Sequence, residues 1–392
     1  MKGRLWKQWL GTALALCLIL AFGQTSHAAK LHGKSLKIGH LACLSGICAE
    51  WGAAAKIGMT IALEEIHASG GIGGLPVEVI EYDDEGKGAP AIPLLERLVN
   101  QDKVLAINGP CQSSTFEVLA RKLDRLQIVI VSYCSSAPGL SALSPWAFRN
   151  TLTSDKQLEP TVRRWQRAYN IKTAVILYND EDRVSTAEGR DILTKLFEKN
   201  GIKLLEMFTF QSKTVDFAPY ITKIKALNPD GIGLGSCYEA GAKIAIEARR
   251  QGVKAPLVGG ACNSTSGLIE IGGPAVEGYY GSTAAWIDSP DPKVVKFVRE
   301  FQKRSTGGKK PVYGGLRSYD NAYLFKKIIE EGGVTNNPDD LEKDRERIKN
   351  GWAKVKDFPG ISGLTTMDAV GDGIGEVKTL VVKGGVFIEG KD

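Results

Sequence analysis

Short apolar runs alternate with longer amphipathic stretches along most of the chain. In the first third, the apolar runs predict β-strands at residues 36–42, 77–82, 104–108 and 127–132. The stretches between them carry apolar residues at helical spacing and predict helices at residues 53–68, 89–101 and 114–123. Such alternation is typical of a parallel sheet with crossover helices.

A second series of the same kind begins near Phe148. Its predicted strands are residues 173–178, 203–208, 231–235, 256–258 and 276–282, and its predicted helices are residues 155–169, 187–200, 216–227 and 240–251. After Trp286 the pattern predicts helices at residues 291–304, 318–331 and 338–355 and a hairpin at residues 377–388. Two series in a chain of 392 residues imply two α/β domains.

The first 28 residues differ from the rest and predict a secretory signal peptide. A basic start is followed by an apolar run at residues 10–22 and by the small-x-small cleavage pattern Ser26-His27-Ala28. The run is too short for a comfortable transmembrane helix. Cys17 lies inside it, but the bulky Leu16 before Cys17 disfavours a lipoprotein signal. We therefore expect cleavage after Ala28 and a periplasmic protein.

Composition excludes several classes of function. Hydrophobic residues make up 43% of the chain and charged residues 24%, as in ordinary soluble globular proteins. The net charge of +6 falls to +3 once Lys2, Arg4 and Lys7 leave with the signal peptide. A charge this weak and dispersed predicts neither nucleic-acid nor membrane-surface binding.

Every cysteine of the expected mature chain follows a predicted strand: Cys43, Cys48, Cys111, Cys134, Cys237 and Cys262. An even number of cysteines in an exported protein favours disulfides, although six cysteines allow 15 connectivities. Proximity of neighbouring strand ends favours the pairs 111–134 and 237–262, and the pair 43–48 would close a short local loop. The alternative is that some are buried free thiols. A metal site is not expected, because the chain has no CxxC pair and only four histidines.

Small polar and aromatic residues also follow the strands, where open α/β sheets bind ligands. Taken singly, each has an ordinary explanation as a cap or turn residue. Taken together they predict a ligand cleft between the two domains, with these candidate ligand-binding residues: Trp51, Gln112, Ser113, Ser135, Ser136, Cys237, Tyr238, Cys262 and Asn263.

Catalytic arrangements find little support in the sequence. Only His40 could approach a cleft, and a core imidazole is the simpler interpretation of a histidine inside a strand. The acidic residues 83–85 read as a turn and cap cluster. Residues 368–373 contain two acids and a glycine but lack the ligand spacing of a calcium loop, so a polar turn is expected. No catalytic residue and no cofactor is predicted.

Several motifs carry a resemblance to a known family. They are KIG at 37–39, LSG at 44–46, WG at 51–52, ALEEI at 62–66, GGI at 70–72, EYDD at 81–84, and NGP at 108–110 leading to Ser113-Ser114. In this combination the chain resembles periplasmic solute-binding proteins of ABC importers, of the leucine/isoleucine/valine-binding type. The resemblance covers nearly all of the expected mature chain.

The resemblance implies a type I periplasmic-binding fold, in which two doubly wound parallel-sheet lobes are joined by a three-segment hinge. Lobe 1 would take residues 35–149 and 284–361, and lobe 2 would take residues 150–283 and 362–392. Hinge closure would trap the ligand without covalent chemistry. The implied partners are a small-molecule solute and the membrane permease of an ABC importer, and a monomer is expected.

The resemblance also implies roles for the candidate residues. Gln112 or Ser113 would receive a ligand carboxylate, with further contacts from Ser135 and Ser136. Trp51 would stack on or cap the ligand, and Cys237 or Tyr238 would close over it from lobe 2.

One departure from the family concerns the ligand's charge. Amino-acid binders of this type place an acid after the lobe 2 strand to pair with the ligand ammonium, but residues 259–263 contain none. Only Glu239 could substitute for it. A buried ammonium without a counter-charge is costly. A carboxylate without an amine, such as an aromatic acid, or a neutral amide is therefore expected. The alternatives are a branched-chain amino-acid receptor, an amide-sensing receptor, or a thiol-active exported enzyme.

Overall fold

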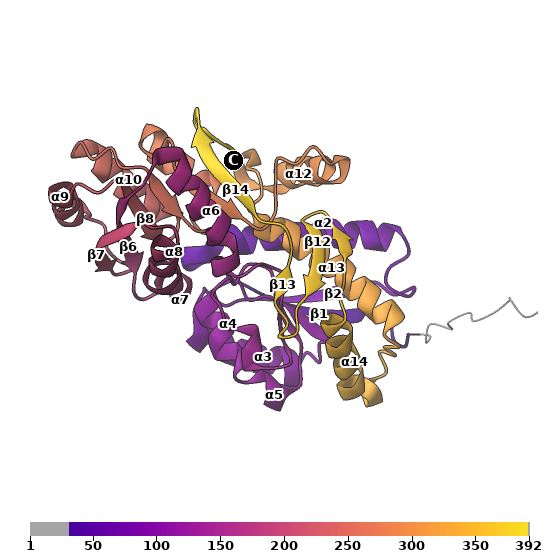
Figure 1. Ribbon diagram of the computed structural model, residues 1–392. Coiled ribbons are helices and arrows are strands. Elements are labelled where there is room, and N and C mark those ends of the chain that lie inside the picture. Colours follow the sequence, from indigo (N-terminus) through magenta and orange to yellow (C-terminus); the bar gives the residue numbers. More distant parts are fainter. Residues whose placement is uncertain (1–30, 391–392) are drawn as a thin grey trace, which may run out of the picture.

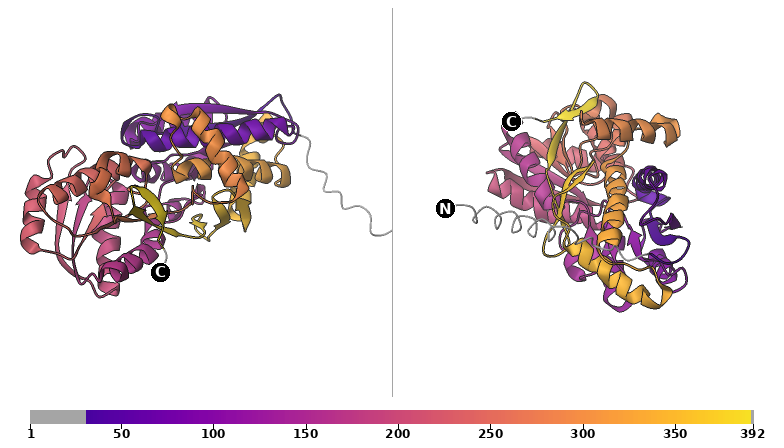
Figure 2. Two further views of the ribbon diagram at one scale, coloured as in Figure 1. Left: turned by 90° about the horizontal axis from the view of Figure 1, so that it is seen from above. Right: turned by 90° about the vertical axis from the view of Figure 1, so that its right-hand side faces the viewer.

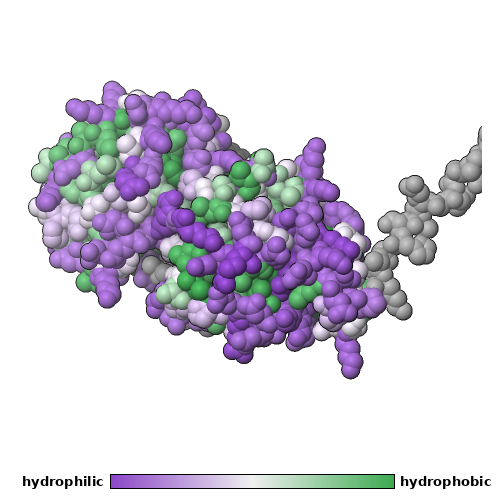
Figure 3. Space-filling model, turned by 90° about the horizontal axis from the view of Figure 1, so that it is seen from below, coloured by the Kyte–Doolittle hydropathy of each residue, from purple (hydrophilic) through white to green (hydrophobic). Residues whose placement is uncertain are grey.

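The protein folds into two α/β lobes that lie side by side (Figure 1). The computed structural model describes residues 31–390. The expected signal peptide and Cys17 lie outside the described residues. Figure 2 shows the two lobes from above, with the C-terminal segment passing between them. The space-filling view in Figure 3 shows hydrophilic residues over most of one face and a constriction where the lobes meet.

Lobe 1 is built on a five-stranded parallel sheet in the order β2-β1-β3-β4-β5. From β1 the chain first adds β2 on one side and then β3, β4 and β5 on the other side. This order is that of a doubly wound sheet. Its strands are β1 (Leu36–Ala42), β2 (Val77–Asp83), β3 (Ala106–Asn108), β4 (Ile130–Ser132) and β5 (Ala147–Arg149). Its helices are η1 (Gly46–Cys48), α2 (Ala49–Ala68), α3 (Gly88–Asn100), α4 (Ser113–Ala120), α5 (Leu123–Leu126), η2 (Ser141–Leu143), α12 (Pro292–Arg304), η5 (Thr306–Gly308), α13 (Tyr313–Glu331), η6 (Pro338–Asp340) and α14 (Leu341–Ala353).

Lobe 2 contains a seven-stranded sheet in the order β15-β14-β10-β9-β8-β6-β7. Its strands are β6 (Thr173–Asn179), β7 (Lys203–Phe210), β8 (Gly231–Gly235), β9 (Leu257–Gly259), β10 (Tyr280–Thr283), β14 (Lys378–Lys383) and β15 (Val386–Glu389). Its helices are α6 (Ser154–Tyr169), α7 (Arg183–Thr186), the π-helix η3 (Ala187–Leu193), α8 (Thr194–Lys199), α9 (Ala218–Leu227), α10 (Tyr238–Arg250), α11 (Ser266–Gly272) and η4 (Gly273–Val276). The C-terminal hairpin β14–β15 extends the sheet antiparallel to β10. Strand β14 is the yellow strand labelled in Figure 1.

Three segments of the chain cross between the lobes, and one buried arginine touches all three. Arg317 of α13 donates to Oδ1 of Asn150 after β5 over 3.0 Å and to Oγ1 of Thr365 over 3.3 Å. It also donates to the carbonyl oxygen of Ala284 after β10. Its side chain is 2% exposed, so these contacts form inside the hinge.

A small sheet that the hydrophobic pattern did not predict lies within the third crossing. It comprises β11 (Phe358–Gly360), β12 (Gly363–Met367) and β13 (Gly373–Ile374). Arg149 at the end of β5 anchors it through Asp372, with nitrogen–oxygen distances of 2.5 and 3.0 Å. Residues 363–374 thus contact lobe 1 before the chain enters β14, and the lobe boundaries at 149/150, 283/284 and 361/362 stay a proposal.

Most predicted elements form close to their expected limits, with two notable differences. Helix α13 begins at Tyr313, five residues before the predicted start, and the first half of the helix predicted at 187–200 is a π-helix. The glycine-rich residues 70–74 lie between α2 and β2, and four of these glycines have positive φ. Among residues 31–390, no helix is long and apolar enough to cross a membrane.

Candidate ligand-binding cleft

The carboxyl ends of the strands in the two sheets face each other across a narrow cleft. The remaining space measures about 30 Å³, which is room for about two water molecules. It is lined by Cys48, Trp51, Cys111, Gln112, Ser113, Cys134, Ser136, Val184, Cys237, Tyr238, Cys262 and Tyr313. Seven of the nine candidate residues therefore meet at one space, and the structure describes the lobes in a closed arrangement.

The loop after β3 positions Gln112 and Ser113 in the cleft. Gly109 turns the chain with φ of 117°, and a Cβ there would lie 1.9 Å from the carbonyl oxygen of Leu41, so this close approach requires glycine. Ser113 is the first residue of α4, and its Oγ accepts a hydrogen bond from the Ala137 N–H over 3.3 Å. The N–H groups of the first turn of a helix have no intrahelical partners, so they suit an anion.

The loop after β4 sends its two candidate serines in different directions. Ser135 donates from Oγ to the carbonyl oxygen of Cys111 over 2.6 Å and does not line the cleft. Ser136 does line it, and its Oγ lies 3.0 Å from Oγ of Ser154. Of this pair, only Ser136 is therefore placed to touch a ligand.

Aromatic side chains form one wall of the cleft. Trp51 in α2 packs edge-on against Tyr313, with ring centroids 4.7 Å apart. Tyr313 donates from its hydroxyl to the carbonyl oxygen of Cys134 over 3.1 Å. Sequence reasoning missed Tyr313, because nothing in its local pattern distinguishes it from a core residue of α13.

Lobe 2 contributes Tyr238 and two cysteines. Tyr238 is the first residue of α10, and burial, followed by the nearby carboxylates of Glu50, Glu239 and Glu270, raises its pKa to about 12. Its hydroxyl therefore keeps its proton at neutral pH. Asn263 does not line the cleft: its Nδ2 donates to the Ser236 carbonyl oxygen over 2.6 Å inside lobe 2.

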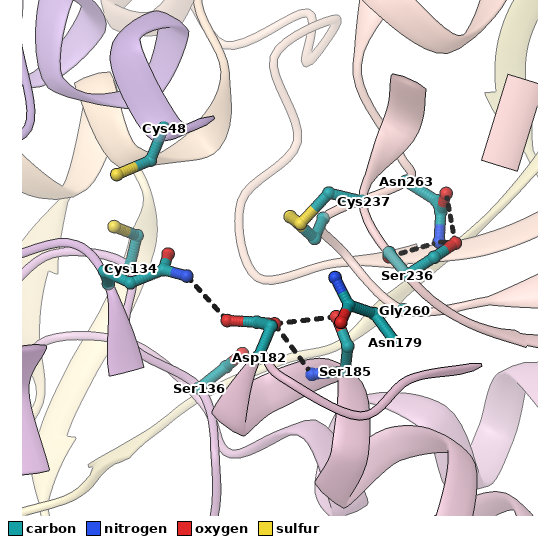
Figure 4. The surroundings of a disulfide bond; sticks show 12 residues. Cys48, Cys134, Ser136, Asn179, Asp182, Ser185, Ser236, Cys237, Gly260 and Asn263 are labelled. Atoms are coloured by element: carbon teal, nitrogen blue, oxygen red, sulfur yellow. Dashed lines mark hydrogen bonds between the residues drawn. A yellow bond between two sulfur atoms is a disulfide. The ribbon is translucent and has the colours of Figure 1, made fainter. Parts of the chain in front are cut away.

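The structure confirms the three expected disulfides, Cys43–Cys48, Cys111–Cys134 and Cys237–Cys262. Five of the six cysteines line the cleft. Figure 4 shows Cys237 in lobe 2 facing Cys48 and Cys134 of lobe 1 across the space. Sulfur is polarisable and packs well against aromatic rings, so the cleft combines an apolar wall with a few hydroxyl and amide groups.

Two buried carboxyl groups of lobe 2 lie behind the cleft, and sequence reasoning missed both. Asp182 accepts hydrogen bonds from Gln112 across the lobes over 2.6 Å and from the Ser185 N–H over 2.9 Å (Figure 4). Burial raises the pKa of Asp182. Glu188 is 1% exposed, and its Oε1 lies at a hydrogen-bond distance of 2.9 Å from the hydroxyl oxygen of Ser154. Burial and the charge of Asp182 raise the pKa of Glu188 to about 8.

A cluster of charged residues lies at the other edge of the cleft. Lys309 of lobe 1 pairs with Glu270 of lobe 2 over 2.8 Å. Glu50 faces this pair, and burial raises its pKa, although Lys309 opposes the rise. The exposed Glu239 lies on a neighbouring hollow and does not line the cleft.

A larger cavity of about 270 Å³ lies beside the cleft and shares Tyr313 with it. Its walls come from the start of α11, the second crossing, the segment before α13 and the C-terminal hairpin. Ile269, Trp286, Val312 and Phe387 make it mostly apolar. None of the nine candidate residues lines it, so the cleft remains the candidate site.

The rejected sites behave as ordinary structure. His40 is 1% exposed in β1 and pairs through Nδ1 with Glu81 over 3.1 Å. Asp83 accepts hydrogen bonds from the backbone N–H groups of Leu44, in the loop after β1, and of Glu85 in its own turn. Asp368 accepts hydrogen bonds from backbone N–H groups of its own loop. Within the described residues 31–390, no group of three or more acidic, histidine or cysteine side chains could hold a metal ion.

Comparison with known proteins identifies the family. A family model described as "Periplasmic binding protein" matches residues 35–380. This chain belongs to the periplasmic binding protein family. The "Leucine-, isoleucine-, valine-, threonine-, and alanine-binding protein" of Pseudomonas aeruginosa is 23% identical over 369 residues, which are 93% of each chain.

Two solved structures show the same fold. One is LivJ from Streptococcus pneumoniae, a branched-chain amino acid transporter substrate binding protein, in complex with isoleucine. It is 23% identical to this chain with a TM-score of 0.80, and the match covers 91% of this chain and 100% of LivJ. A solute binding protein of an ABC transporter from R. palustris in complex with benzoate is 19% identical with a TM-score of 0.79 and covers 91% and 95%. Both likenesses agree with the fold of the periplasmic binding protein family.

Proposed function

We propose that this periplasmic binding protein traps a small carboxylate-bearing or amide-like solute, such as an aromatic acid, for the membrane permease of an ABC importer. The observation that carries the proposal is the lining of the cleft: among the described residues around it, none is charged. Hydroxyl groups and the first turn of α4 can donate hydrogen bonds to an oxygen-bearing ligand. An aromatic body would pack against Trp51, Tyr238, Tyr313 and the disulfides.

The carboxyl groups near the cleft do not favour an ammonium ligand. Oδ1 of Asp182 accepts from Gln112 and Oδ2 from Ser185, and neither oxygen lines the space. Glu188, with a pKa of about 8, is mostly protonated and neutral at pH 7. An α-amino acid would therefore bury its ammonium without a counter-charge, which is costly.

Binding requires the lobes to open and close. The closed space of about 30 Å³ is smaller than an aromatic acid, so the solute enters an open form and the lobes then close around it. The ligand biases this equilibrium because it contacts Ser113 and Ser136 on one lobe and Tyr238 on the other. A monomer suffices for this cycle.

A branched-chain amino-acid receptor is the second candidate, since the relative from Pseudomonas aeruginosa and LivJ are both named as binding proteins for branched-chain amino acids. An amide-sensing receptor has the same lining in its favour. No observation favours a thiol-active enzyme, because all six cysteines of residues 31–390 form disulfides.

Thermal-shift and calorimetric titration with benzoate, benzamide and leucine test the proposal, after native mass spectrometry of freshly purified protein to detect retained ligand. We expect benzoate or benzamide to raise the melting temperature and leucine to leave it unchanged. Ser113→Ala and Tyr238→Phe should each weaken binding about tenfold, since hydrogen bonds to charged ligands contribute about 1.5–3 kcal/mol.

The matched controls are Ser114→Ala and Tyr220→Phe, which do not line the cleft and should bind as the wild type does. A melting shift with leucine alone would contradict the proposed ligand class. Equal losses in the control variants would contradict the proposed site.

A further inference from the structure

Glu188 connects the interior of lobe 2 to the surface of the cleft through two serines. Its Oε1 lies 2.9 Å from Ser154 Oγ, and Ser154 Oγ lies 3.0 Å from Ser136 Oγ. The Ser154 N–H donates to the Ser136 carbonyl oxygen over 2.8 Å, which fixes the two serine backbones together. Ser136 lines the cleft, so this chain of hydrogen-bonded groups, from Glu188 through Ser154 to Ser136, ends where a ligand would bind.

The surroundings hold the Glu188 carboxyl group in place. A Cβ at Gly260 would lie 2.2 and 2.3 Å from its two oxygens, so the glycine leaves just the room that the carboxyl occupies. Oε2 of Glu188 is buried and has no hydrogen-bond partner within residues 31–390. Because unpaired buried charge costs far more than an unpaired carbonyl oxygen, this environment favours the neutral acid.

The position of the acid proton follows from the same geometry. A carboxyl O–H is a strong donor, and a serine hydroxyl can donate or accept. Within residues 31–390, Ser154 Oγ is the hydrogen-bond partner of the Glu188 carboxyl group. The proton therefore belongs on Oε1, where it is donated to Ser154, and Oε2 is left as the carbonyl oxygen. Ser154 then has its own proton free to donate to Ser136.

We propose that Glu188 is a positioning residue that, through Ser154, turns the Ser136 hydroxyl into a donor toward the cleft and so selects ligands with a carboxylate or carbonyl oxygen. With Glu188 neutral, each hydroxyl donates to the next, and the Ser136 proton points at the ligand. With Glu188 ionised, Ser154 must donate to Glu188 and Ser136 must donate to Ser154. The Ser136 oxygen then presents only its lone pairs to the cleft, and these repel a ligand carboxylate.

The inference deepens the proposed function and rests on it for the identity of the ligand class. It adds one expectation that the lining alone does not give: affinity for a carboxylate should fall as Glu188 ionises. Burial, which raises the pKa of Glu188 to about 8, places that change just above neutral pH.

Charged and titratable groups around Glu188 agree with this assignment. Asp182, before α7, is the acid whose charge raises the pKa of Glu188. The hydroxyl groups of Tyr279 and Tyr313 face it from before β10 and from the start of α13, and both tyrosines are buried with raised pKa. Tyr178 of β6 packs against Gly189, the next residue.

Other charges on the neighbouring helices point elsewhere. On η3 itself, Arg190 pairs with Asp191 over 2.8 Å at the surface. On α6, Asp155 and Lys156 are exposed. Neither helix therefore supplies a cation that would ionise Glu188.

Calorimetric titration with benzoate and with benzamide from pH 6 to pH 10 tests the inference on the wild type, Glu188→Gln and Ser154→Ala. In the wild type we expect benzoate affinity to fall about tenfold as the pH rises past 8, the effect of losing one hydrogen bond to a charged group. Glu188→Gln keeps an uncharged donor and should bind benzoate equally at every pH. Ser154→Ala should bind more weakly and without pH dependence.

The control is Asp84→Asn, which removes another buried acid, one with a pKa of about 6 outside the cleft, and should keep the wild-type pH profile. A wild-type affinity that does not change with pH, or a Glu188→Gln profile identical to the wild type, would overturn the inference.

A measurement without ligand separates this inference from the proposed function. Infrared spectroscopy should show a protonated carboxyl band that disappears near pH 8 in the wild type and is absent from Glu188→Gln. If neither benzoate nor benzamide binds at any pH, the proposed ligand class fails, and the band decides this inference. Its presence at pH 7 supports the neutral acid, and its absence overturns it.

Discussion

Gln112 of lobe 1 donates a hydrogen bond from Nε2 to Oδ1 of Asp182 in lobe 2 over 2.6 Å. This bond lies at the edge of the ligand cleft and joins the two lobes through the protein's own side chains. Hydrogen bonds to a carboxylate contribute about 1.5–3 kcal/mol, which is comparable to the free-energy differences between open and closed forms. Closure is therefore partly a property of the protein itself.

Replacing Gln112 by Glu should open the ligand-free protein. The new carboxylate would face Asp182 at hydrogen-bond distance, so the attraction becomes a repulsion between like charges. Small-angle X-ray scattering should report a larger radius of gyration for Gln112→Glu than for the wild type. Gln101→Glu, at an exposed position at the end of α3, is the control and should scatter as the wild type does. Unchanged scattering of the Gln112 variant would show that this contact does not hold the lobes together.

Two ion pairs across the lobes should make closure only weakly dependent on salt. Arg183 pairs with Glu117 over 3.1 Å and Lys309 with Glu270 over 2.8 Å, and all four side chains are partly exposed. Pairs of this kind contribute about 0–1 kcal/mol each and are screened by salt. We expect Glu117→Gln combined with Glu270→Gln to weaken solute affinity by a few-fold at low salt and not at high salt. A salt-independent loss would point to a packing effect instead.

The disulfides should differ in their contribution to stability. In the chain-entropy model a cross-link stabilises more as the closed loop lengthens. The pairs Cys111–Cys134 and Cys237–Cys262 span 23 and 25 residues, and Cys43–Cys48 spans 5. Replacing either long pair by serines should lower the free energy of unfolding by about 3 kcal/mol, against about 2 kcal/mol for the short pair. Urea denaturation of the three double variants measures this, and equal losses would contradict the ranking.

Glu188 should make the protein less stable as the pH rises. Its pKa is about 8 in the folded protein against 4.5 for an ordinary glutamate, so the folded state holds the proton more tightly. The stabilisation is complete below about pH 4.5 and is lost progressively up to about pH 8, at roughly 1.4 kcal/mol per pH unit.

Glu188→Gln removes this dependence. The difference in melting temperature between the variant and the wild type should therefore grow in favour of the variant from pH 5 to pH 8. Asp84→Asn, which removes a buried acid whose pKa is only about 6, should show a smaller difference that levels off at lower pH. A constant difference for Glu188→Gln would mean that Glu188 is ionised in the folded protein.

Sequence patterns predicted the two lobes well because alternation of strands and helices is a local signal. The strand ends carry the cleft, so placing Ser113, Ser136 and Tyr238 after strands was enough to bring them to one space. The same logic gave the disulfide pairs, since neighbouring strand ends are neighbours in space. The hinge sheet β11–β13 escaped prediction because its strands are only two to five residues long and contain glycine or proline, so they show no clear hydrophobic pattern.

The directions in which individual side chains point could not be predicted from the sequence. Ser135 and Ser136 are adjacent and chemically identical, yet only Ser136 faces the cleft, because the Cys111 carbonyl oxygen accepts the Ser135 hydroxyl. Asp182 and Glu188 lie in a polar stretch that reads as a solvated helix start. Their burial depends on lobe 1 and on the absent side chain of Gly260, neither of which is local information.

Arg317 has a consequence for how the molecule moves. Its guanidinium group donates hydrogen bonds to all three segments that cross between the lobes. Because one side chain links them, we expect the three segments to move together. We expect rotation of the lobes to be confined to one axis near this side chain, and other relative movements of the lobes to be suppressed. Any partner that recognises the closed form would then meet the same closed geometry, whichever solute is bound.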